Sequence, residues 1–142
     1  MNQQSLYDRL GGAAAVTAVV DDFVGRCAAD SRINGKFART DVPRLKAMLV
    51  EQVSAATGGP VQYTGRRMAE THRGMGVTGG EFEALVEDLL ATLNKFSVPG
   101  ALQAELIGIL APIRSDVVEV ESSATGTPLP DSYQTAPPLA AV

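Results

Sequence analysis

Apolar residues recur along the chain at the spacing of helices. Over residues 16–27 they occur at i, i+3, i+4, i+7, i+8 and i+11, which places them on one face of a helix. Two further stripes of the same kind run through residues 82–96 and 102–117. No segment shows the alternation of apolar and polar residues that is typical of a strand. The pattern therefore predicts an all-α fold.

Helix start and stop signals give the boundaries of the predicted helices. Ser5 can cap a short helix over residues 6–10, and Gly11-Gly12 would end it. Thr78-Gly-Gly-Glu81 matches a capping box at the start of the long helix 79–96. Glycine breaks flank a short polar segment over residues 66–73. The other predicted helices cover residues 13–29, 42–57 and 99–120, the last with a kink at Pro112. Asp41 or Thr40 can cap the helix over residues 42–57.

The chain has 142 residues, which suits one domain with one core. We expect that domain to span residues 1–120. Residues 121–142 are rich in Pro, Ser, Thr and Ala and show no periodicity. The sequence therefore predicts a disordered C-terminal tail over these residues.

Charge and composition exclude several classes of protein. The formal net charge is −4, whereas nucleic-acid-binding proteins usually carry a basic excess. No apolar run approaches the ~20 residues that span a bilayer. The N-terminal residues lack the basic start and apolar run of a signal peptide. The single cysteine, Cys27, cannot form an internal disulfide and is expected to be a small buried apolar residue. We therefore expect a cytoplasmic protein without a nucleic-acid or membrane partner.

His72 is the only histidine of the chain and lies on the short segment 66–73. This segment has few apolar residues to anchor it, so a bond between a metal and the imidazole could hold it in place. A lone histidine on a polar helix is otherwise a solvated surface residue. The residues by themselves leave both interpretations open.

Several stretches occur in an order and spacing that resembles a known family. They are residues 5–12 (SLYDRLGG), 57–65 (TGGPVQYTG) and 68–72 (MAETH), extended by residues 76–78, Phe82 and residues 109–118. Over about residues 5–120 the chain resembles the group I truncated haemoglobins. The resemblance implies a truncated-globin fold, a two-over-two helical sandwich around haem b.

The resemblance also assigns residues to the cofactor. His72 corresponds to the proximal histidine, which is the metal ligand of the iron. The other implied contacts are Phe37 against the porphyrin, Met68 on the proximal face, Phe82, Leu85 and Leu89 along the wall, Leu45 on the distal side, and Thr40, Arg44 and Tyr63 near the propionates. The guanidinium of Arg44 suits a carboxylate, although a solvated charge on a helix is an equal alternative.

The distal side departs from the family's pattern. The family usually has a tyrosine directly after the phenylalanine of the second helix, and its hydroxyl donates to bound oxygen. Here that pair is Phe23-Val24, and the facing positions of the third helix are Leu45 and Leu49, with Met48 beside them. Losing a hydrogen bond worth about 1.5–3 kcal/mol weakens oxygen retention by roughly 10- to 100-fold. Met48 could ligate the iron through its thioether, although a methionine at helical spacing is more often core filler.

The function expected from this resemblance is reversible binding of diatomic gases, namely O2, CO and NO, for oxygen transport or gas sensing. The alternative is an enzyme that converts nitric oxide to nitrate, but an apolar distal pocket disfavours it because oxygen must stay bound. Peroxidase chemistry lacks a distal acid–base histidine. A globin-shaped scaffold without haem is disfavoured by His72. We assign no catalytic residue, and we expect an unknown reductase as partner and a monomer or weak dimer.

Overall fold

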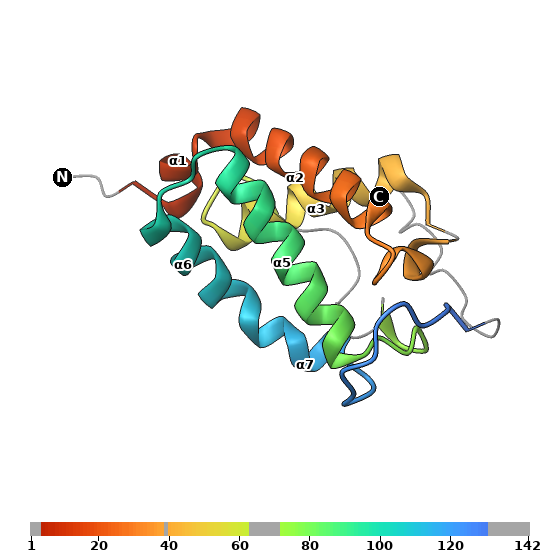
Figure 1. Ribbon diagram of the computed structural model, residues 1–142. Helices are drawn as coiled ribbons and strands as arrows, with labels where there is room; N and C mark the ends of the chain where they lie inside the picture. Colours follow the sequence, from red (N-terminus) through yellow and green to blue (C-terminus); the bar gives the residue numbers. More distant parts are fainter. Residues whose placement is uncertain (1–3, 39, 63–71, 131–142) are drawn as a thin grey trace.

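The computed structural model describes residues 4–38, 40–62 and 72–130, and these residues form helices joined by short turns (Figure 1). The elements in chain order are α1 (Leu6–Leu10), α2 (Gly12–Ala29), the 3-10 helix η1 (Asn34–Phe37), α3 (Val42–Ala56), α5 (Gly79–Lys95), α6 (Gly100–Leu110), the 3-10 helix η2 (Ala111–Ile113) and α7 (Arg114–Val117). One isolated bridge, between Thr78 and Val120, is the β-pairing within the described residues. The predicted all-α class is confirmed.

The predicted capping residues begin their helices as expected. Ser5 Oγ accepts the backbone N–H of Asp8 at 3.1 Å at the start of α1, and Gly11 ends that helix with a φ of 116°. Asp41 caps α3 by accepting the N–H of Arg44 at 3.2 Å. At the start of α5 both halves of the predicted capping box are present. Local side-chain chemistry therefore decides where these helices begin.

The helices pack in two layers that cross one another (Figure 1). Helix α2 contacts both α3 and α5, and α1 contacts α6. Buried leucines of α5 and α6 share a cluster with Leu6 of α1. A second cluster joins α2 to α3 through its buried valines. These two clusters account for most of the apolar stripes in the sequence.

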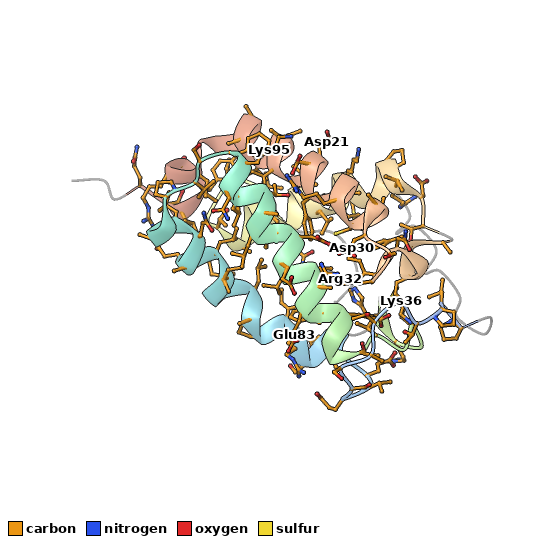
Figure 2. All side chains as sticks on the ribbon, in the orientation of Figure 1. Asp21, Asp30, Arg32, Lys36, Glu83 and Lys95 are labelled. Atoms are coloured by element: carbon orange, nitrogen blue, oxygen red, sulfur yellow. The ribbon has the colours of Figure 1, made fainter. Side chains whose placement is uncertain are left out.

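Asp22 links α2 to α5 through charged hydrogen bonds. Its carboxylate accepts from Thr92 Oγ1 at 2.7 Å and from Lys95 Nζ at 2.8 Å, and Arg26 lies 2.7 Å away on its own helix. These bonds hold the pKa of Asp22 well below its usual range. Figure 2 shows Lys95 at the end of α5 that lies beside α2.

The last predicted helix, 99–120, is shorter and less regular than expected. Helix α6 ends at Leu110, a 3-10 turn carries Pro112, and α7 ends at Val117. Proline lacks the N–H that an α-helix needs at this position, which explains the break in place of a kink. Val118 is then extended, with a ψ of 121°.

The chain beyond residue 120 continues to pack on the helices. Gly80 donates its N–H to the carbonyl of Ser122 at 2.9 Å, and Gly126 donates to the carbonyl of Arg32 at 2.6 Å. The packed structure thus reaches residue 130, past the predicted boundary at residue 120. Residues 131–142 lie outside the described residues, so the disorder predicted for them stays a prediction. No helix of the described part is long and apolar enough to cross a membrane.

Candidate functional site

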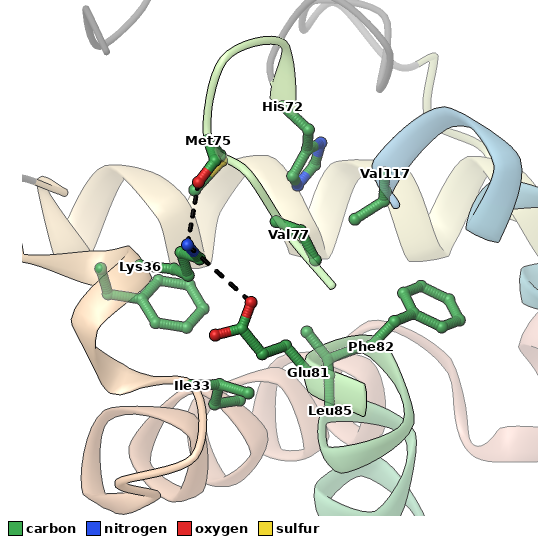
Figure 3. A pocket seen from close by; sticks show the side chains of 10 residues that line it. Ile33, Lys36, His72, Met75, Val77, Glu81, Phe82, Leu85 and Val117 are labelled. Carbon is green, nitrogen blue, oxygen red and sulfur yellow. Dashed lines mark hydrogen bonds and ion pairs between the residues drawn. The ribbon is translucent and has the colours of Figure 1, made fainter. Parts of the chain in front are cut away.

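A small pocket lies between η1, the turn before α5, and α7, and His72 lines it (Figure 3). Its cavity volume is about 60 Å³. Its polar lining residues are Lys36, His72 and Glu81. Its apolar lining residues are Ile33, Phe37, Met75, Val77, Phe82, Leu85 and Val117. The pocket therefore presents one imidazole to a wall that is otherwise mostly apolar.

A backbone hydrogen bond and two glycines shape the turn that follows His72. Met75 donates its N–H to the carbonyl of His72 at 3.1 Å. Gly74 and Gly76 have φ values of 85° and 69°, which lie in the left-handed region that favours glycine. Met75 and Val77 are buried in a cluster with Val117. The glycines thus let the chain turn sharply between the histidine and α5.

A buried ion pair closes one side of the pocket (Figure 3). Lys36 Nζ lies 3.8 Å from Glu81 Oε1, and their side chains are 5% and 1% exposed. Glu81 Oε1 also accepts the N–H of Thr78 at 3.0 Å, while its Oε2 accepts both the N–H and the hydroxyl of Thr127 at 2.8 Å. Lys36 and Glu81 are therefore satisfied although they are out of water, as buried charges need to be.

Three of the five residues predicted for the distal side belong to an apolar cluster between α2 and α3. Val24 is 4% exposed, and Leu45 and Leu49 pack against its cluster. Tyr7 also belongs to this cluster, but its ring lies against Gly59, where a Cβ would come within 2.7 Å of Tyr7 Cδ2. The residues of α3 that pack against this cluster, Val42, Leu45, Leu49, Val50 and Val53, have aliphatic side chains that carry no hydrogen-bond donor.

The structure brings together only part of the predicted site. His72, Phe37, Phe82 and Leu85 line the same pocket. Leu89 lies instead in the cluster of Leu6, Leu93 and Leu106, away from that pocket. Arg44 is exposed, Thr40 and Met48 are half-buried, and Phe23 packs between two apolar clusters. Tyr63 and Met68 lie outside the described residues.

Other lining residues were not predicted to belong to the site. Lys36 is a buried lysine beside Phe37, and nothing in its neighbourhood distinguishes it from a surface lysine. Glu81 was expected only as part of the capping box. Val77 and Val117 lie in stretches that carry the family resemblance, which is the one signal that could have placed them here.

A second group of charges lies at the other side of η1, where α2 ends (Figure 2). Arg32 forms a bidentate pair with Asp30, with bonds of 3.0 and 2.9 Å, and its guanidinium lies 3.9 Å from Asp88 of α5. Arg32 lowers the pKa of Asp30 to about 2, whereas burial and the neighbouring Asp30 raise the pKa of Asp88 to about 6.

Cys27 lies next to these carboxyl groups and is 2% exposed. Burial, followed by the charges of Asp88 and Asp30, raises the pKa of its thiol to about 12. The thiol is thus protonated and shielded, which makes it a poor nucleophile and a poor metal ligand. Among the described residues there is no group of three or more His, Cys, Asp or Glu side chains that could hold a metal ion by itself.

The lining chemistry fits the haem that the resemblance implies. An imidazole is a common haem ligand, and Phe37, Phe82 and Leu85 supply an apolar wall for a flat ring system. The cavity volume of about 60 Å³ is well below the roughly 300–1,000 Å³ of typical ligand pockets. The fit therefore rests on the donor set and its apolar surroundings and not on volume.

A family model and individual relatives identify the same family of proteins. The profile of the family "Bacterial-like globin" matches residues 5–119. The chain is 37% identical over 118 residues to "Group 1 truncated hemoglobin GlbN" of Mycolicibacterium paratuberculosis, an alignment that covers 83% of this chain and 87% of the relative. It is 39% identical over 109 residues to the protein of the same name from Synechocystis, with 74% and 88% covered.

Solved structures agree with the sequence relatives. Truncated hemoglobin from Tetrahymena pyriformis in its Fe(III) form superposes with a TM-score of 0.78 at 32% identity, covering 81% of this chain and 98% of that one. The 2/2 hemoglobin from Synechococcus, in the cyanomet state and with covalently attached heme, gives a TM-score of 0.78 at 36% identity with the same coverage.

Proposed function

Because the chain belongs to the bacterial-like globin family, as a group 1 truncated haemoglobin, we propose that it binds diatomic gases reversibly at a haem iron ligated by His72. Haem-based gas binding follows from the family itself. The assignment of His72 rests on one observation: the only histidine of the chain lines an apolar pocket together with Phe37. A neutral imidazole in such surroundings is a suitable ligand for haem iron.

The surrounding residues would bind the cofactor and exclude water. Haem, when bound, supplies an iron centre that takes up O2, CO or NO. Phe37 would pack against the macrocycle, and Phe82 and Leu85 would form its wall from the first turns of α5. Val117 of α7 would close the pocket from the other side. The chain would take haem b, because its single cysteine is buried and unreactive.

The aliphatic cluster around Val24 supports weak retention of oxygen. Val24, Leu45 and Leu49 carry no hydrogen-bond donor, so oxygen lacks the stabilisation that a polar distal side chain would give it. A buried water could act as donor only where two or more polar partners hold it, and this cluster offers few. Carbon monoxide is less polarised, so its retention should suffer less. An aliphatic distal side therefore favours reversible binding or sensing over nitric oxide dioxygenation, which needs oxygen to stay bound.

Absorption spectra of the purified protein test the ligand assignment. We expect a Soret band that shifts when the reduced protein takes up carbon monoxide, and we expect His72→Ala to lose both haem content and that spectrum. Arg73→Ala is the matched control, because Arg73 is adjacent and exposed. An unchanged spectrum in His72→Ala would show that another group holds the iron.

Nitrate yield separates the carrier from the enzyme. Mixing the oxygenated protein with nitric oxide under multiple-turnover conditions, with an added reductase, should give little nitrate beyond one equivalent. Sustained nitrate formation would favour the dioxygenase. We further propose a cytoplasmic location and a monomer or weak dimer, which cell fractionation and sedimentation would test.

A further inference from the structure

The turn after His72 is held from outside by a carboxylate. Glu119 Oε2 accepts the N–H of Gly74 at 3.0 Å, and its Oε1 accepts the N–H of Gly76 at 2.7 Å. Glu119 is itself held in place, because its own N–H donates to the carbonyl of Val77 at 2.9 Å. One side chain thus binds two peptide groups within four residues of the histidine.

A cation holds the second of these peptide groups through its carbonyl oxygen. Lys36 Nζ donates to the carbonyl of Met75 at 2.9 Å, on the buried side of the same turn (Figure 3). Residues 74, 75 and 76 are therefore each tied to a charged side chain from another part of the chain. Because Met75 also donates to the carbonyl of His72, this network leads directly to the backbone of the histidine.

Both holding groups are joined through the C-terminal segment 118–130. Glu119 belongs to this segment, and Lys36 Nζ donates a second bond to the carbonyl of Pro128 at 3.0 Å. Leu129 packs on the cluster that contains Met75 and Val117. The segment 118–130 therefore passes over the turn and contacts it both near its start, through Glu119, and near its end, through Leu129.

We propose that Glu119 is a positioning residue for His72, and that Lys36 acts with it. Together they fix the turn 74–76 and so set the orientation of the His72 imidazole toward the haem iron. The proposal rests on the proposed function, in which His72 is the iron ligand. Outer partners of a metal-binding histidine commonly change metal affinity by roughly 10- to 100-fold when they are removed. Glu119 is exposed and acts through the backbone, so we expect the lower end of that range.

The test compares Glu119→Ala and Glu119→Gln with the control Glu121→Ala. Glu121 lies two residues further along the same segment, is exposed, and pairs with Arg114 at 2.9 Å. Three quantities are measured on the proteins as purified. They are amide hydrogen exchange at Gly74 and Gly76, the iron–histidine stretching frequency of the reduced protein, and the rate of haem transfer to an acceptor apoglobin.

We expect Glu119→Ala to speed exchange at both amides, to shift and broaden the iron–histidine band, and to raise the haem-transfer rate by about ten-fold. Glu119→Gln keeps one acceptor oxygen and should lie between the wild type and Glu119→Ala. Glu121→Ala should match the wild type in all three quantities. If Glu119→Ala lowers overall stability so far that it cannot be purified, Glu119→Gln carries the same comparison.

A second arm separates positioning from general stability. In His72→Gly supplied with free imidazole, the iron ligand is no longer covalently attached to the backbone. Adding Glu119→Ala there should leave the haem-transfer rate and the iron–imidazole band unchanged. An equal effect of Glu119→Ala with and without this replacement would overturn the proposal, as would an unshifted iron–histidine band in Glu119→Ala.

Different results would overturn the role of His72 as iron ligand and the role of Glu119 as positioning residue. A wild type that contains no haem, or a spectrum unchanged in His72→Ala, would overturn the proposed function and this inference with it. A haem-loaded wild type whose Glu119 variants behave like Glu121→Ala would overturn the inference alone.

Discussion

Asp88 of α5 and Asp30 at the end of α2 face each other in a partly buried site, and Arg32 pairs with Asp30 but stays 3.9 Å from Asp88. Oδ2 of Asp88 is buried and has no hydrogen-bond partner among the described residues. Protonation would let Asp88 donate a hydrogen bond to Asp30. Burial of the charged form, followed by this hydrogen bond, raises the pKa of Asp88 to about 6, while the hydrogen bonds from Arg32 lower that of Asp30 to about 2.

This pair makes stability depend on pH in a defined direction. Asp88 binds its proton more tightly in the folded chain than at its unperturbed pKa of 3.8, so its contribution is complete below about pH 4. That contribution is lost as the pH rises through about 6. Asp88→Asn supplies a permanent donor, and we expect it to raise the free energy of unfolding at pH 7.5 by about 1–2 kcal/mol.

Urea denaturation between pH 4 and pH 8 measures this effect. The gain from Asp88→Asn should shrink steadily toward pH 4, where the wild-type carboxyl is itself protonated. Glu83→Gln is the control, because Glu83 is an exposed carboxylate of the same helix. If the gain in the free energy of unfolding does not vary with pH, Asp88 does not take up a proton in this range.

Val24→Tyr should restore a distal donor and slow the release of oxygen. A hydroxyl that donates to bound oxygen is worth about 1.5–3 kcal/mol, so the dissociation rate should fall by roughly 10- to 100-fold. Val24→Phe fills the same space without a hydroxyl and separates size from hydrogen bonding. Stopped-flow measurement of oxygen and carbon monoxide release would show the change in oxygen alone. Equal rates in Val24→Tyr and Val24→Phe would count against the assigned distal face.

Lys36→Met should cost much more stability than the same change at an exposed ion pair. It leaves Glu81 buried without its cation, and breaking one partner of a buried pair costs about 3–5 kcal/mol. Glu81 keeps its bonds from Thr78 and Thr127, so we expect the lower end. Lys46→Met breaks an exposed pair with Asp21 and should cost about 1 kcal/mol or less. Equal losses in chemical denaturation would show that burial of Lys36 contributes nothing.

Gly80→Ala should loosen the C-terminal segment. A Cβ on Gly80 would collide with the carbonyl group of Ser123, and overpacking of this kind costs about 1–3 kcal/mol. Gly108 lies inside α6, where a Cβ would meet nothing within 4 Å. Gly108→Ala should therefore gain up to about 1 kcal/mol from helix propensity. Thermal unfolding of the two variants should move in opposite directions, and a gain in Gly80→Ala would contradict the close packing.

The sequence was most informative where structure is decided locally. The capping residues Ser5, Asp41 and Thr78 act within three positions of themselves, so their patterns could be identified before any tertiary structure was known. The apolar stripes likewise predicted which helix faces are buried. The end of the chain could not be predicted in this way. Residues 122–127 are held partly through their own backbone groups, which composition and periodicity do not register.

The candidate site shows the same division. His72 lies in a short motif that resembles a family, and Phe37 was assigned as a haem contact by that resemblance. Lys36 binds the carbonyl of Pro128, which is 92 positions away in the sequence, and no local pattern encodes such a contact. Periodicity shows that Leu89 lies on the buried face of α5 but not which neighbours it contacts. It could not show that Leu89 packs in the cluster around Leu93 and not in the pocket.

The separation between Glu119 and the turn that it binds has a consequence for biosynthesis. Gly74 leaves the ribosome 45 residues before Glu119 does, and Lys36 leaves 92 residues before Pro128. A nascent chain therefore contains His72 and Lys36 before it contains Glu119, which binds the turn, or Pro128, which binds Lys36. The turn beside His72 can therefore reach its final geometry only after residues 119 and 128 have been synthesised.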